Sequence, residues 1–159
     1  MQAIQALYQQ HATVVYRFSL GLCGDKHLAN DLVAETFVRA MMSSSPIGME
    51  TVQGYLCTIA RRLYLKEWYR HQRHTELEDV YRDMAPGPEQ SLMAARELQH
   101  TLAALQQLPE IDRAAVLMRA EDEVPYEDIA RALGISLSSA KVKVFRARLK
   151  LTQIMKEAS

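Results

Sequence analysis

The stretch YEDIARALGISLSSAKVKVFRARLK, residues 126–150, decides the fold. Apolar residues recur at helical spacing on both sides of one glycine, Gly134, which can adopt the positive φ that a tight turn between two helices needs. We therefore predict helices over 126–133 and 137–155, with Ser136 or Ser138 as the N-cap of the second. The pattern is typical of a helix-turn-helix unit.

The second of these helices combines a small apolar face with many cations. The positions that fit a buried face are Ala140, Val144, Ala147 and Leu151. A basic helix that follows such a turn suits the major groove of DNA. The residues that we expect to contact DNA are Ser138, Ser139, Lys141, Lys143, Arg146 and Arg148. A helical hairpin with a solvated basic face is the structural alternative.

Charge is segregated along the chain although the net charge is zero. Residues 61–74 carry a net charge of +4, residues 75–130 carry −9, and residues 131–159 carry +6. Such segregation creates local fields even when the total cancels. The helix-turn-helix is therefore not the only basic segment, and the run at 61–74 is a second candidate for binding nucleic acid.

The remaining segments are helical in pattern, with glycine and proline mostly between them. We predict helices over 2–22, 31–42 with Asn30 as N-cap, 51–73, 91–107, and 109–121 with Pro109 in its first turn. Residues 43–48 form a loop, and 75–90, which contain APGP, form a flexible linker. The fold class is all-α, with two small helical domains at 1–74 and 91–159.

Two modules of the chain resemble bacterial sigma factors of the extracytoplasmic-function group. LQQLPEIDRAAVLMRAEDEVPYEDIARALGISLSSAKVKVFRARLKL (105–151) is similar to the C-terminal domain of that family. DLVAETFVRAM (31–41) and GYLCTIARRLYLKEWYRHQRH (54–74) are similar to its N-terminal module. The departures are Ala34 for the common glutamine, Ala140 for valine, and serines at 138 and 139 for a Gly-Thr pair.

The resemblance implies a transcription initiation factor that binds core RNA polymerase and directs it to promoter DNA. The helix-turn-helix would bind the −35 element, and the helix in 54–74 would bind and open the −10 element. The implied polymerase-binding residues are Asp31, Leu32, Glu35 and Arg39. A separate anti-sigma protein is the expected inhibitor, and the acidic linker either threads the RNA exit path or is a solvated tether.

The residues of the second basic run suit binding to melted DNA. Cations can hold a sugar-phosphate backbone, and aromatic faces can stack on unpaired bases. The residues expected at the −10 element are Arg61, Arg62, Lys66, Trp68, Tyr69, Arg70 and Arg73. Core packing is an equal alternative for Trp68, and packing is favoured for Tyr64. The loop at 43–49 would capture a flipped base, or it is an ordinary connection.

Several classes of function are disfavoured. No apolar run reaches the roughly 20 residues of a membrane span, and the start lacks a secretory layout, so we expect a cytoplasmic protein without membrane insertion. Cys23 and Cys57 are too few for a disulfide framework, and His71 and His74 lack further ligands for zinc. No carboxylate cluster or nucleophile arrangement indicates an enzyme, and we expect neither metal nor cofactor. A stand-alone helix-turn-helix regulator is the alternative function.

Overall fold

The computed structural model describes residues 2–43, 49–72, 92–120 and 124–158, and within them the chain forms helices and no strand. The helices are α1 (Gln2–Cys23), α2 (Lys26–Met42), α3 (Val52–Gln72), α4 (Leu92–Gln106), α5 (Glu110–Ala120), α6 (Tyr126–Leu133) and α7 (Leu137–Ala158). The predicted all-α fold is confirmed. None of the described helices is long and apolar enough to cross a membrane.

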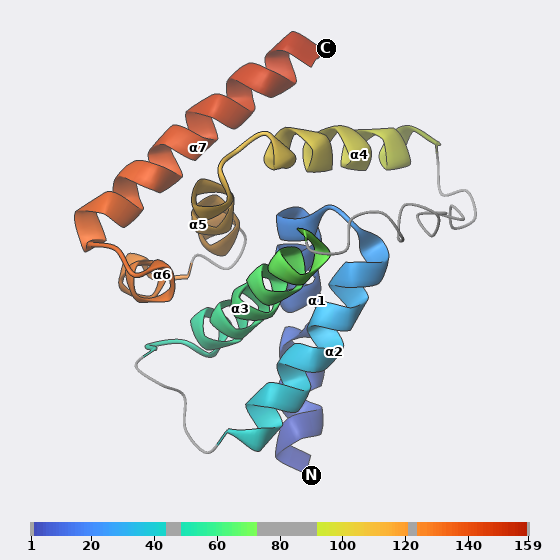
Figure 1. The fold of residues 1–159 in the computed structure, drawn as a ribbon, viewed down its shortest axis with the longest axis vertical. Helices are drawn as coiled ribbons and strands as arrows, with labels where there is room; N and C mark the ends of the chain where they lie inside the picture. Colours follow the sequence, from blue (N-terminus) through green and yellow to red (C-terminus); the bar gives the residue numbers. More distant parts are fainter. Residues whose placement is uncertain (1, 44–48, 73–91, 121–123, 159) are drawn as a thin grey trace.

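The helices form two groups that pack on each other (Figure 1). Helices α1, α2 and α3 make the N-terminal half, and α4 to α7 make the C-terminal half. Across the boundary, which we call the seam, α1 packs on α4 and α5, while α3 packs on α5 and α6. The two halves are therefore in direct contact in this structure.

One hydrophobic core runs through both halves. Its largest cluster contains Phe18 of α1 and Leu56 of α3 from the N-terminal half. The same cluster continues into Met118 of α5 and Ile129 of α6 in the C-terminal half. The sequence predicts an apolar face for each of these helices, but not that the faces of the two halves meet.

The start of α2 differs from the prediction. Gly24 ends α1 with a φ of 75°, and the Asp25 carboxylate then caps α2 by accepting from the backbone N–H groups of His27 (2.8 Å) and Leu28 (3.3 Å). The prediction of an N-cap at Asn30 is wrong, because an earlier cap is available. Helix α2 begins at Lys26. Ala29 therefore lies in its first turn, where it is completely buried.

Two smaller differences concern α5 and α3. Pro109 precedes α5 instead of lying in its first turn, and its carbonyl accepts the backbone N–H of Arg113 at 2.9 Å. In α3, the helix begins at Val52 rather than at residue 51, and its buried face includes Leu56, Cys57 and Tyr64.

Candidate nucleic-acid interface

The helix-turn-helix is formed by α6, a turn at Gly134, and α7. Gly134 has φ 68° and ψ 37°, the left-handed conformation that favours glycine, and it caps the end of α6. The Ser136 hydroxyl then accepts the backbone N–H of Ser139 at 3.1 Å, as an N-cap does. The predicted bounds of α6, the turn and the start of α7 are all confirmed.

Helix α7 buries one face and exposes another. Ala140, Val144 and Ala147 are buried against the rest of the C-terminal half, as their spacing predicts. Among the expected DNA-contacting residues, those that the structure leaves exposed are Ser138, Lys141, Arg146 and Arg148, with Ser139 partly covered. The helix therefore presents several cations and hydroxyl groups on its open side.

Lys143 is held by a carboxylate inside the C-terminal half. Its ammonium lies 3.5 Å from Asp112 of α5, and Arg146 reaches the same carboxylate at 3.7 Å. The Lys143 side chain is only 19% exposed, whereas that of Arg146 is 58% exposed. Asp112 thus orients both cations, and Arg146 keeps more surface for a ligand.

Sequence reasoning missed an apolar stripe on the exposed side of α7. Val142, Phe145 and Leu149 are all exposed, and the Phe145 side chain is 64% exposed. These residues recur at spacings of three and four, which places them on one face of a helix. The helical spacing was visible in the sequence, but the direction of the stripe depends on which face α5 covers.

The second basic run lies at the C-terminal end of α3. Arg62, Lys66 and Arg70 are exposed there, and Arg70 pairs with Glu67 one turn away at 3.0 Å. Trp68 and Tyr69 are 42% and 61% exposed, and their rings meet edge to face with centroids 5.1 Å apart. The core alternative for Trp68 does not fit this exposure.

Two other members of the run face the seam. Arg61 makes a two-bond pair with the Glu110 carboxylate of α5, at 2.7 and 2.8 Å, and its side chain is 15% exposed. Tyr64 is buried, and its hydroxyl accepts from the Arg113 guanidinium at 3.2 Å. Burial raises the pKa of the Tyr64 hydroxyl. In this structure neither side chain is available to DNA.

The expected polymerase-binding face of α2 is only partly on the surface. Asp31, Glu35 and Arg39 are exposed, and Glu35 lies 3.9 Å from Arg39. Leu32 is 4% exposed and belongs to the core, so in this structure it does not lie on the exposed face with the other three. Its position between exposed residues reflects the helical period, which turns it inward.

Some expected sites lie outside the described residues. These are Arg73, most of the loop at 43–49, and the linker at 75–90. Among the described residues, no group of three or more His, Cys, Asp or Glu side chains is arranged to hold a metal ion.

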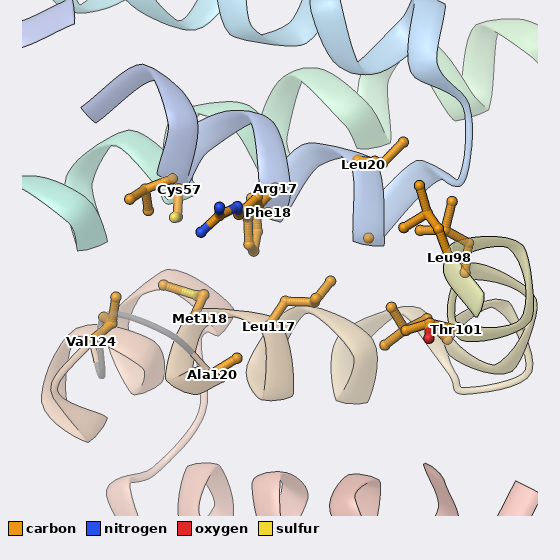
Figure 2. Close-up of a pocket in the computed structure, with 14 residues that line it drawn as sticks. Arg17, Phe18, Leu20, Cys57, Leu98, Thr101, Leu117, Met118, Ala120 and Val124 are labelled. Atoms are coloured by element: carbon orange, nitrogen blue, oxygen red, sulfur yellow. The ribbon is translucent and has the colours of Figure 1, made fainter. Parts of the chain in front are cut away.

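An apolar cavity of about 320 Å³ lies at the seam between α1, α4 and α5 (Figure 2). Phe18, Leu117 and Met118 line it, together with Cys57 of α3. Domain boundaries are common places for ligand pockets, but such pockets also carry polar groups that orient the ligand. This lining is mostly apolar, with Arg17 and Thr101 as its polar side chains, so we interpret the cavity as incomplete packing between the halves.

Comparison with known proteins places both halves in one family. Residues 7–74 match Sigma-70 region 2, and residues 99–151 match Sigma-70, region 4. The ECF RNA polymerase sigma factor SigL of Mycobacterium tuberculosis is 31% identical over 91% of this chain and 84% of its own length.

Another relative is longer than this chain, and a solved structure shares the fold. The ECF RNA polymerase sigma factor SigE of Mycolicibacterium smegmatis is 32% identical over 100% of this chain, which spans 64% of that protein. The sigma factor RpoE from Bartonella quintana, solved with the anti-sigma factor NepR, has a TM-score of 0.77 at 23% identity and 98% coverage of each chain.

Proposed function

Because this chain belongs to the extracytoplasmic-function group of the sigma-70 family, we propose that it directs core RNA polymerase to promoters. Residues 1–74 would bind polymerase and the −10 element, and residues 91–159 would bind the −35 element. The chain would act by binding alone, without a catalytic step of its own.

One observation carries this proposal: two helices in different halves each expose cations beside aromatic side chains. Helix α7 exposes Lys141 and Arg148 near Phe145, and α3 exposes Lys66 near Trp68 and Tyr69. Cations supply attraction to phosphate that does not depend on sequence, whereas aromatic and apolar contacts distinguish bases or strands. Two such surfaces suit a protein that reads two separated DNA elements.

Helix α7 is proposed to read the −35 element from the major groove. The Arg146 and Arg148 guanidinium groups can donate to guanine or phosphate, and Ser138 is placed at the start of the helix, which enters the groove first. The exposed stripe of Val142 and Phe145 suits contact with thymine methyl groups, since apolar side chains recognise that group.

The exposed end of α3 is proposed to open the −10 element. A factor that hydrolyses no nucleotide must melt DNA by binding single strands more tightly than duplex. Each base stacked on an aromatic side chain contributes about 1–3 kcal/mol toward that preference. Trp68 and Tyr69 would supply the stacking, while Lys66 and Arg70 hold the backbone. The expected roles of Arg73 and of the loop at 43–49 are part of this proposal.

The exposed face of α2 is proposed to dock on core polymerase. Asp31, Glu35 and Arg39 carry both signs of charge on one side of the helix, and the opposite side is core. Charged surface groups of this kind affect association rate and specificity more than stability. Replacement of one of them should therefore weaken docking without unfolding the chain.

Control by a separate anti-sigma protein in the cytoplasm is the remaining part of the proposal. The similar solved structures are of RpoE with the anti-sigma factor NepR and of CnrH with the cytosolic domain of CnrY, which supports an inhibitor of this kind. The acidic linker at 75–90 would span the two DNA-binding halves.

The test is to add the purified chain to core RNA polymerase and sequence the transcripts that start from genomic DNA. A defined set of new start sites, preceded by two shared sequence elements, is expected. Tight promoter binding by the chain without polymerase, and no new transcripts with it, would instead favour a stand-alone regulator.

A further inference from the structure

A buried carboxylate from one half caps a helix of the other. Asp128, in the first turn of α6, is fully buried and accepts three hydrogen bonds from the N-terminal end of α3. Its Oδ1 accepts the Glu50 backbone N–H at 2.7 Å. Its Oδ2 accepts the Thr51 backbone N–H at 2.9 Å and the Thr51 hydroxyl at 2.8 Å. Figure 1 shows α6 beside the start of α3.

This contact is shaped for a short acidic side chain. Free backbone N–H groups and the helix dipole favour a negative charge at the start of a helix. Gly54 lets Asp128 approach, because a Cβ at residue 54 would lie 2.5 Å from Oδ2. Thr51 also caps α3 locally, since its hydroxyl accepts the Gly54 backbone N–H at 3.0 Å. Helix α3 therefore keeps a cap of its own when Asp128 leaves.

The same closed arrangement occupies Arg61, which we expect at the −10 element. Its guanidinium is paired with Glu110, and the neighbouring Tyr64 is buried and bonded to Arg113 across the seam. All three contacts, including that of Asp128, join α3 to the C-terminal half. Binding of α3 to DNA through Arg61 requires that these contacts break.

Geometry also demands that the halves separate. The labels −10 and −35 count base pairs from the transcription start, so the elements lie about 25 base pairs apart, or roughly 85 Å along the helix at about 3.4 Å per base pair. A compact chain of 159 residues has a radius of gyration of about 15 Å, and so is roughly 40 Å across. The closed chain cannot reach both elements at once.

We propose that Asp128 is an autoinhibitory latch, which holds the two halves closed by capping α3 across the seam. Promoter engagement then needs an open form in which α3 is capped by Thr51 alone. The claim that closure inhibits promoter binding rests on the proposed function. The claim that Asp128 holds the halves closed concerns conformation alone and is tested separately.

Two variants of the full chain break the latch by different routes. Asp128→Asn keeps the shape of the side chain but replaces one acceptor oxygen with an NH2 donor. Whichever way the amide is turned, this donor faces the backbone N–H of Glu50 or of Thr51. Gly54→Ala inserts a methyl group against the carboxylate, while alanine favours the helical state of α3. Glu127→Gln is the matched control, because it removes one negative charge from the same turn at an exposed position.

The first readout is the radius of gyration by small-angle X-ray scattering, with circular dichroism to verify helix content. We expect about 15 Å for the unmodified chain and the Glu127→Gln control, and an increase of at least ~3 Å for both latch variants at unchanged helicity. If both latch variants keep the unmodified radius, Asp128 does not hold the halves together and the proposal is overturned.

The second readout is equilibrium binding of the complex with core RNA polymerase to promoter DNA. Because a closed majority lowers apparent affinity, both latch variants should bind the promoter about 3- to 10-fold more tightly than the unmodified chain. Expanded variants with unchanged promoter affinity would refute the inhibitory role. If the unmodified chain and both variants form no complex with polymerase, the proposed function fails, and the scattering still decides whether Asp128 is a latch.

Discussion

Replacement of Tyr69 by alanine tests strand opening by α3 most directly. The Tyr69 side chain is 61% exposed, and its ring contact within the chain is the edge-to-face pair with Trp68. An exposed aromatic pair contributes little to folding, so Tyr69→Ala should lower the free energy of unfolding by about 1 kcal/mol or less. Any large functional loss must then come from the complex with DNA.

The size of that loss follows from base stacking. One base stacked on an aromatic ring is worth about 1–3 kcal/mol, which corresponds to roughly a 5- to 150-fold change in the melting equilibrium. Initial association of the polymerase complex with duplex promoter should stay near normal, because phosphate contacts dominate that step. The variant should therefore bind the promoter yet fail to open it.

The assay is permanganate oxidation of unpaired thymines in a promoter bound by polymerase and the variant chain. A template with a pre-melted bubble should restore transcription, since the stacking energy is no longer needed for melting. Tyr8→Ala is the matched control, because Tyr8 of α1 is 48% exposed and its ring also meets another ring, that of Phe37, edge to face. Normal permanganate reactivity of Tyr69→Ala on duplex DNA would refute the assignment of this ring to strand opening.

Three further predictions concern docking, base reading and thiol chemistry. Glu35→Lys should weaken core-polymerase binding in equilibrium titrations at unchanged helicity, because its pair with Arg39 is exposed and worth little to folding. Phe145→Ala should relax one promoter position at a cost of about 1–3 kcal/mol, whereas Arg148→Ala should weaken binding to all sequences and lower the salt slope by about one. Burial raises the pKa of the Cys23 thiol to about 11, so its alkylation at pH 8 should be roughly 100-fold slower than in the unfolded chain, and faster as pH rises. Equal rates in folded and unfolded chains would exclude that effect of burial.

Local features of the fold were predictable from the sequence. The turn at Gly134 and the bounds of α6 depend on residues that are neighbours in the sequence. The spacing of the apolar residues and the capping residues can be identified from the sequence alone. The start of α2 was less certain in principle, because Asp25 and Asn30 are both good caps. The choice between them is made by burial of Ala29, which only the packed structure reveals.

Features that join distant segments could not be predicted. Asp128 reads as an ordinary acid in the first turn of a helix, and its partners Glu50 and Thr51 lie more than seventy residues earlier. The burial of Leu32 and the exposure of Phe145 could not be predicted from the sequence either. A helical period places residues on faces, but the neighbouring helices decide which face is core and which is surface.

The cavity at the seam has a consequence for the mechanical strength of the closed form. Side chains that line this pocket do not touch across it, so the surfaces of α1, α4 and α5 adhere less strongly there than fully packed helices would. The packing deficit lies along the plane where the proposed function requires the chain to divide. The two halves can thus part more easily along this plane, although parting also divides the core that joins Leu56 of α3 to Met118 of α5 and Ile129 of α6.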